Sequence, residues 1–205
     1  MEYMMKLSEI YKFSFENRCF QLLIEAYNVV FQEKNIQPNW NENDISQEIY
    51  EKLDVNPNRL RWYISASREY HLSQDVVKIK GFADKLPRID LRMTSITSGL
   101  EYKYFCEAKR LKEKDLKLKK AYIDDGMDRY ISKKYPFGCM LGYLLEGKTD
   151  ETIKGINYLL QSNKRNSEVL TLKSHKLLKS VYESNHLHIG TITHLIFDLT
   201  TTSHH

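Results

Sequence analysis

The chain has 205 residues, of which 41% are hydrophobic and 28% charged, and it carries a formal net charge of +4. This balance is that of an ordinary soluble protein, and the length suits one domain that buries a core of its own. No apolar stretch approaches the roughly 20 residues that a membrane helix needs, and the N-terminal segment lacks the apolar centre of a signal peptide.

The three cysteines, Cys19, Cys106 and Cys139, are odd in number, widely spaced and set in apolar surroundings. This usage indicates buried thiols in a reducing compartment. We therefore expect a cytoplasmic protein with no membrane partner.

Hydrophobic spacing predicts the first elements of the chain. Residues 12 to 34 carry apolar side chains at helical spacing and predict a long helix, and residues 44 to 53 predict a second one. Residues 61 to 72 mix aromatic and β-branched side chains, which is typical of a strand. We expect a single domain over 1–205, with residues 1–40 as an N-terminal helical extension and 41–200 as the core.

The second half of the chain alternates between strand and helix patterns. After a loop that holds Gly81 and Pro87, strands are expected around Asp90 and around Glu107. The later elements are a helix over 113–134, a buried strand over 137–145, a helix over 150–161, a further helix over 174–184 and β-pairing over 186–199. The predicted fold class is α/β, with a central mixed β-sheet flanked by helices.

Two of the expected strands carry acids that can meet. Asp90 lies in the first strand, and the second ends in Glu107-Ala108-Lys109, with Glu107 seventeen positions after Asp90. Side chains alternate along a strand, so Glu107 and Lys109 share one face. If the two strands pair, both carboxylates reach one cation. The alternative is that Asp90, Glu107 and Lys109 only decorate a solvated face of the sheet.

These residue types suit the hydrolysis of a phosphodiester. Two carboxylates, Asp90 and Glu107, hold Mg²⁺ through hard oxygen ligands and leave positions for water and phosphate. A neighbouring ammonium, that of Lys109, orients the attacking water and balances the developing charge. Two other acid-x-Lys triplets, Asp115-Leu116-Lys117 and Glu146-Gly147-Lys148, lack a preceding strand that bears an acid.

The arrangement resembles the PD-(D/E)XK, or restriction-endonuclease-like, nuclease superfamily. The motif matches at Asp90 and at Glu107-Ala108-Lys109, although Ile89 stands where the superfamily has proline and the proline is Pro87. Residues 122–130 and 138–143 are also similar to a bacterial group of this superfamily. The resemblance implies a restriction-endonuclease-like core, catalytic roles for Asp90, Glu107 and Lys109, and metal ligation by Asp90 and Glu107.

Enzymes of this superfamily usually add an acid from the preceding helix. At 100° per residue, Glu42 falls within about 20° of the centre of the buried stripe of the second helix, whereas Glu48 lies roughly 100° away. Glu42 is therefore the first candidate for a catalytic acid, and Glu48 is the reserve. The alternative is that Glu42 only interacts favourably with the helix dipole.

A basic segment follows the motif directly. Residues 109–120 hold seven basic side chains against two acidic ones, a local charge of +5. Such clusters bind phosphate backbones by releasing counterions, although charge runs also occur simply as solvated faces. The candidate nucleic-acid contacts are Arg110, Lys112, Lys117, Lys120 and Arg129. Arg129 has an alternative partner in Asp125, four residues earlier on the expected helix.

Two functions are consistent with these patterns. The first is a metal-dependent nuclease with Mg²⁺ as cofactor and Mn²⁺ as a substitute, acting on DNA rather than RNA. The resemblance places such an enzyme in restriction or phage defence, as a homodimer or as a subunit of a larger complex. The alternative is a non-catalytic nucleic-acid-binding or assembly domain that retains the nuclease fold.

Overall fold

The computed structural model describes residues 2–71, 88–97, 99–132, 135 and 137–200, and for residues 2–8, 70 and 71 it describes the backbone alone. The predicted loop with Gly81 and Pro87 lies outside these residues. In chain order the helices are α1 (Glu2–Glu33), α2 (Glu42–Asp54), α3 (Pro57–Arg61), α4 (Leu116–Ala121), the π-helix η2 (Tyr122–Met127), α5 (Asp128–Ile131), α6 (Thr149–Ser162) and the 3-10 helix η3 (Asn166–Glu168). The strands are β1 (Ile64–His71), β2 (Arg88–Thr97), β3 (Leu100–Lys112), β4 (Gly138–Glu146), β5 (Thr171–Leu172), β6 (Val181–His186) and β7 (Gly190–Asp198).

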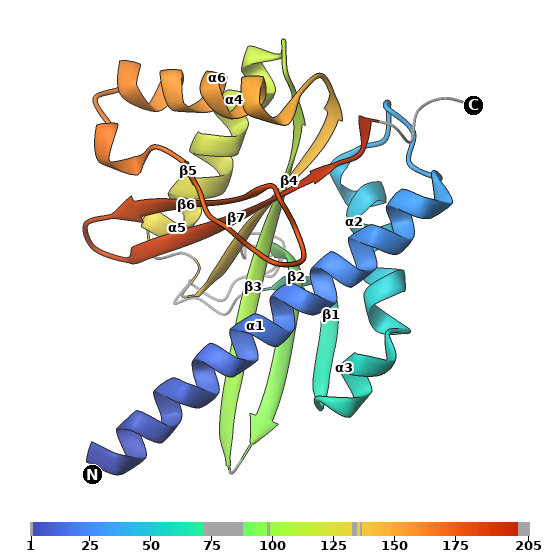
Figure 1. Cartoon of the computed structure of the whole chain (residues 1–205), viewed down its shortest axis with the longest axis vertical. Helices are drawn as coiled ribbons and strands as arrows, with labels where there is room; N and C mark the ends of the chain where they lie inside the picture. Colours follow the sequence, from blue (N-terminus) through green and yellow to red (C-terminus); the bar gives the residue numbers. More distant parts are fainter. Residues whose placement is uncertain (1, 72–87, 98, 133–134, 136, 201–205) are drawn as a thin grey trace, which may run out of the picture.

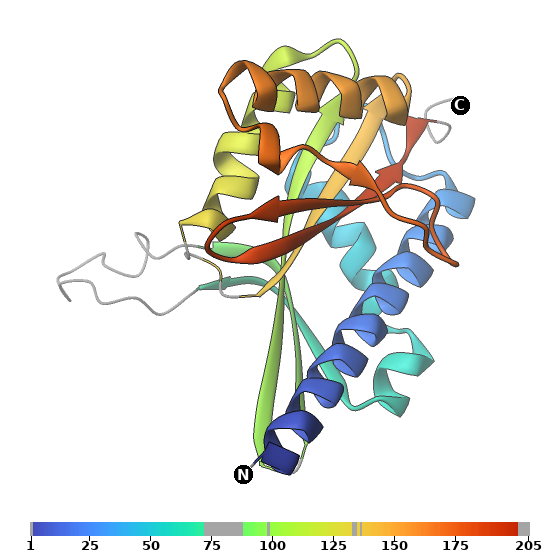
Figure 2. The same cartoon turned by 60° about the vertical axis from the view of Figure 1, so that its left-hand side comes forward.

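The described strands form one mixed sheet in the order β1-β2-β3-β4-β7-β6-β5. The strands β3, β4 and β7 run parallel to one another, while β1 to β3 and β5 to β7 pair antiparallel. Helices α1 to α3 cover one face, and α4, η2, α5 and α6 cover the other (Figures 1 and 2). The predicted α/β fold class, with a mixed sheet between helices, is confirmed.

Two hydrophobic clusters hold these layers together. One joins α1 and α2 to the sheet through residues such as Leu22, Ile45 and Cys106. The other joins η2 and α6 to the opposite face through residues such as Tyr122 and Ile153. Apolar burial on both faces of the central strands is the main stabilising contribution to such a fold.

The first two helices follow the predicted patterns. The side chains on the expected buried face of α1, including Cys19, are shielded from solvent, and all three cysteines are buried and free as predicted. Helix α2 starts with a capping box, in which Asn41 accepts from the backbone of Asp44 and the Asp44 carboxylate accepts from the backbone of Asn41. The Ser46 hydroxyl lies 3.0 Å from that of Tyr143 on β4, which ties α2 to the sheet.

The helix predicted over 174–184 is wrong. Residues 181–186 form β6, which pairs antiparallel with β7, with Val181 opposite Leu195 and His186 opposite Gly190. Val181 and Tyr182 are buried on opposite faces, each in a different hydrophobic cluster. Local spacing suggested a helix, but ladder hydrogen bonds and burial on both faces outweigh that preference.

The helix predicted over 113–134 is interrupted. The π-helix η2 separates α4 from α5, and Gly126 within it packs against β4: a β-carbon there would lie 2.4 Å from Cε of Met140. A second close approach occurs at Gly138, where a β-carbon would lie 1.6 Å from the backbone oxygen of Phe105. Among the residues that the structure describes, no helix is both long enough and apolar enough to cross a lipid bilayer.

Candidate active site

The carboxylates of Asp90 and Glu107 lie on the adjacent antiparallel strands β2 and β3. Leu91 pairs with Cys106 in the register of these strands. Asp90 and Glu107 are the next residues beyond that pair on their strands, and the charge of Asp90 acts on the Glu107 carboxylate. Asp90 Oδ2 also accepts a hydrogen bond from the backbone nitrogen of Ala108 at 2.7 Å. The prediction that the two acids lie on neighbouring strands is confirmed.

Glu107 is fully buried, so the alternative of a solvated sheet face is wrong for this residue. Its Oε1 accepts hydrogen bonds from Lys109 Nζ, at 2.7 Å, and from Arg129 Nη1. Its Oε2 is shielded from solvent and has no hydrogen-bond partner among the residues that the structure describes. Burial, followed by the charge of Asp90, raises the pKa of Glu107 to about 7, although Lys109 and Arg129 act to lower it.

The Lys109 ammonium joins the strand acid to helix α2. It donates to Glu107 Oε1, to Glu42 Oε1 at 2.9 Å and to the backbone oxygen of Ala108 at 2.8 Å. Burial acts to lower the pKa of Lys109, but the carboxylates of Glu107, Glu42 and Asp90 outweigh it and the pKa lies above its usual value. Lys109 is therefore a charged donor at neutral pH.

Glu42 is the acid that α2 contributes. It is the first residue of the helix, and its Oε2 accepts from the backbone nitrogen of Arg110 at 3.1 Å while its Oε1 binds Lys109. Within the described chain, Glu48 makes no hydrogen bond or ion pair with these residues. Helical periodicity thus selected the acid that contacts Lys109. Because Glu42 also accepts from the backbone of Arg110, its role is not limited to an interaction with the dipole of its own helix.

Arg129 belongs to the same cluster of charged side chains as Asp90, Glu107, Lys109 and Glu42. Its guanidinium pairs with Glu107 and donates to the Tyr135 hydroxyl at 3.0 Å, and that hydroxyl donates to the backbone oxygen of Arg88 at 2.8 Å. Asp125, the alternative partner considered for Arg129, forms no ion pair with it among the described residues; the partner is Glu107. Because the guanidinium is still about one third exposed, it faces the solvent side of the site as well as the buried carboxylate.

The course of η2 explains why Arg129 reaches Glu107. A π-helix contains an extra residue per turn, which rotates every side chain that follows it. Gly126 packs closely at this turn, since a β-carbon there would lie 2.4 Å from Cε of Met140 on β4. Neither Arg129 as a partner of Glu107 nor the supporting Tyr135 was predicted, because no sequence signal marked the π-turn.

The remaining basic candidates are divided between β3 and α4. The Arg110 guanidinium donates to a backbone carbonyl in the loop before α2, and Lys112 pairs with Glu146 at 3.4 Å. Lys117 and Lys120 are exposed on α4, the helix that directly follows β3. These two lysines are the basic candidates that remain open to a polyanion.

In the described ranges, no group of three or more His, Cys, Asp or Glu side chains is arranged to hold a metal ion. The candidate ligands are the carboxylates of Asp90 and Glu107, the latter through its unpartnered Oε2. This donor set fits Mg²⁺, which is commonly held by one or two carboxylates and keeps several waters.

No model of a known protein family matches the chain, and no curated protein or solved structure matches it either. The chemistry of the cluster is therefore inferred from its geometry and from the motif.

Proposed function

We propose that this protein is a metal-dependent nuclease that hydrolyses phosphodiester bonds. The observation that carries the proposal is the buried, unpartnered Oε2 of Glu107 beside the Asp90 carboxylate. An unsatisfied buried carboxylate oxygen is costly unless a cation completes its coordination. A divalent ion at Asp90 and Glu107 removes that cost and the repulsion between the two acids.

Mg²⁺, or Mn²⁺ in its place, is the expected cofactor. When bound, such an ion supplies a Lewis acid that polarises a phosphoryl oxygen and lowers the pKa of a bound water. Asp90 and Glu107 would hold it, and Glu107 would also keep Lys109 at the edge of the site.

Lys109 has the role of a charged donor in this proposal. Its raised pKa keeps it protonated, so it orients water and stabilises negative charge rather than accepting a proton. Glu42 positions it by holding the ammonium at 2.9 Å. The exposed side of the Arg129 guanidinium would contact a phosphate oxygen, in the bidentate manner that guanidinium groups favour.

The proposed substrate is nucleic acid. Lys117 and Lys120 lie on α4, the helix that follows β3. There they would contact a phosphate backbone. The preference for DNA, the place in restriction or phage defence and the assembly as a homodimer or a subunit of a larger complex rest on the resemblance of the motif alone.

One observation favours the alternative of a non-catalytic nucleic-acid-binding or assembly domain. Lys109 and Arg129 already neutralise Glu107 without any metal. A domain that has lost its catalytic use could keep such a cluster as a purely structural ion-pair network. Metal binding separates the two functions.

The test measures Mn²⁺ binding by calorimetry and cleavage of plasmid DNA in the same preparation. Asp90→Asn and Glu107→Gln should lose both, because each removes a ligand, whereas Lys109→Met should keep Mn²⁺ binding and lose most of the cleavage. Glu48→Gln, on the same helix as Glu42 but without a contact to the site residues, is the matched control and should behave as wild type. If the wild type binds DNA but neither binds Mn²⁺ nor cleaves, the nuclease proposal is wrong and the binding domain replaces it.

A second arm tests the nucleic-acid surface. Lys117→Glu and Lys120→Glu should weaken DNA binding similarly for all sequences and reduce its dependence on salt. DNA affinity that is unchanged in the double variant would move the contact surface away from α4.

A further inference from the structure

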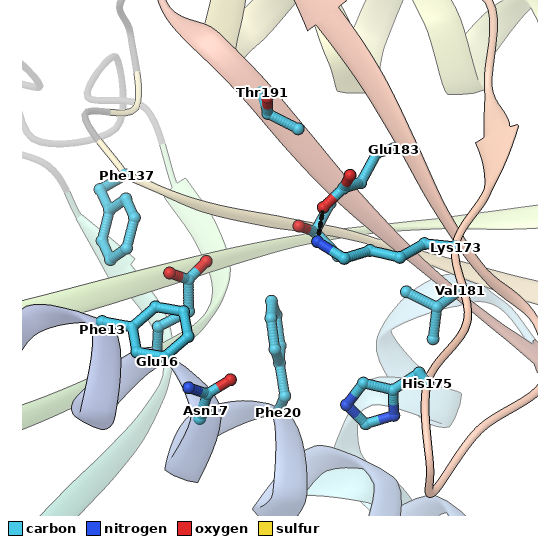
Figure 3. Close-up of a pocket in the computed structure, with 11 residues that line it drawn as sticks. Phe13, Glu16, Asn17, Phe20, Phe137, Lys173, His175, Val181, Glu183 and Thr191 are labelled. Atoms are coloured by element: carbon cyan, nitrogen blue, oxygen red, sulfur yellow. Dashed lines mark hydrogen bonds and ion pairs between the residues drawn. The ribbon is translucent and has the colours of Figure 1, made fainter.

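A cavity of about 360 Å³ lies between α1 and the strands β6 and β7 (Figure 3). It is on the α1 side of the sheet, whereas Glu107 and Lys109 leave the opposite face with Phe105. None of the residues of the candidate active site lines it. The cavity is therefore a separate feature, and its volume lies within the range of small-molecule sites.

Phenylalanine rings form one side of the cavity. Phe13 and Phe20 come from α1, and Phe137 precedes β4. The Phe20 ring is almost completely buried, whereas Phe13 is 67% exposed. The Phe137 ring is held edge-on against Tyr104, with 5.0 Å between ring centroids. These three rings give the cavity an apolar wall.

The Phe137 ring already binds a cation. The ammonium of Lys12 lies 4.3 Å from the ring centroid, within the distance at which cation–π attraction is significant. Lys12 reaches the ring from α1 and is otherwise exposed to solvent. An ammonium is thus the chemical group that this wall accommodates.

The charged groups of the cavity leave one carboxylate without a direct partner. Glu183 pairs with Lys173, which neutralises both. Glu16 points into the cavity and makes no hydrogen bond or ion pair with any described residue (Figure 3). Burial raises the pKa of Glu16, although Lys12 and Lys173 act to lower it. A partly desolvated carboxylate of this kind is stabilised by an incoming cation.

We propose that this cavity binds a small organic cation with an apolar body, of the arylalkylamine class. The ammonium would pair with Glu16, and the apolar body would lie among the rings of Phe13, Phe20 and Phe137. Because the site shares no residue with the proposed nuclease centre, this inference stands or falls independently of that function.

The test compares three probes of the same shape and different charge by calorimetry: 2-phenylethylamine, 2-phenylethanol and 3-phenylpropionate. The amine should bind in a saturable 1:1 manner, and the alcohol and the carboxylate should bind on the order of tenfold more weakly or not at all. Phenylalanine ring resonances of the wild type, followed by NMR, should shift on titration with the amine, which gives a readout that needs no variant.

Two variants test the geometry in opposite directions. Glu16→Gln should weaken amine binding on the order of tenfold, since it removes the charge and keeps the shape. Lys12→Met should strengthen amine binding, because it removes the competing cation from Phe137. Glu33→Gln, at the far end of the same helix, is the control and should bind as wild type.

The proposal is overturned if the amine shows no binding up to about 10 mM. It is also overturned if the neutral alcohol binds as well as the amine, or if Glu16→Gln leaves the amine affinity unchanged while circular dichroism reports an intact fold.

Discussion

Lowering the pH from 7 to 5 should destabilise this protein through one buried imidazole, that of His194 on β7. The side chain is fully buried, with Nδ1 at 2.8 Å from the Tyr122 hydroxyl and Nε2 at 2.8 Å from Oγ of Ser184. Ser184 Oγ in turn lies 2.7 Å from Nε2 of His186. Burial, and secondly the neighbouring His186, lowers the pKa of His194 to about 3.

The sign and size of the effect follow from that shift. The unfolded chain binds a proton at this histidine below its ordinary pKa of 6.5, whereas the folded protein does not until about pH 3. Stability is therefore fully present above pH 6.5 and is lost progressively as the pH falls toward 3. Between pH 7 and 5 the loss amounts to about 2 kcal/mol.

The assay is urea unfolding of the wild type and of His194→Gln at both pH values. Gln is uncharged at either pH and can both donate and accept, so it removes the titration and keeps some of the polar contacts. Carboxylates with raised pKa values, such as Glu107, act with the opposite sign, and the comparison of the two proteins cancels their contribution. The wild-type midpoint should fall by about 1 M urea more than that of the variant.

An equal loss of free energy of unfolding by both proteins between pH 7 and 5 would contradict the role of His194 in this acid destabilisation. That result would mean that the folded state accepts a proton at His194 at little cost. A difference in stability between the two proteins at pH 7 does not test the titration of His194, because only the change of stability with pH reports it.

Three further predictions concern the sheet and the cluster. Gly138→Ala should lower the free energy of unfolding by about 3 kcal/mol, because a β-carbon would lie 1.6 Å from the Phe105 oxygen and force β3 and β4 apart. Thermal melts measure this loss, and an unchanged melting temperature would contradict the close approach. If the nuclease proposal holds, Glu42→Gln should leave Mn²⁺ affinity unchanged and slow cleavage on the order of a hundredfold by misplacing Lys109; an equal loss in both would make Glu42 a ligand instead. The pKa of Glu107 is about 7, so a proton competes with Mn²⁺ for this carboxylate below neutral pH. Mn²⁺ affinity should therefore be about tenfold weaker at pH 6 than at pH 8. An Mn²⁺ affinity that calorimetry finds unchanged between these pH values would show that Glu107 is not protonated in this range.

The geometry within single elements could be predicted from the sequence. Alternation along a strand places Glu107 and Lys109 on one face, and helical periodicity places Glu42 on the buried side of α2. Both relations depend only on the backbone geometry of one element. They were therefore available before any strand pairing or helix packing was known, and the contact of Lys109 with both acids agrees with them.

Relations between elements depended on the tertiary structure. Arg129 meets Glu107 because a π-turn rotates the end of its helix, and the turn forms where Gly126 packs on β4. Residues 181–186 become β6 because β7 offers a ladder to pair with, although their local pattern also suits a helix. His186 on the same strand is buried, and its Nδ1 lies 2.9 Å from Oε2 of Glu168, a residue 18 positions earlier in the chain. Such contacts join residues that are distant in sequence, and their energies appear only once both partners are in place.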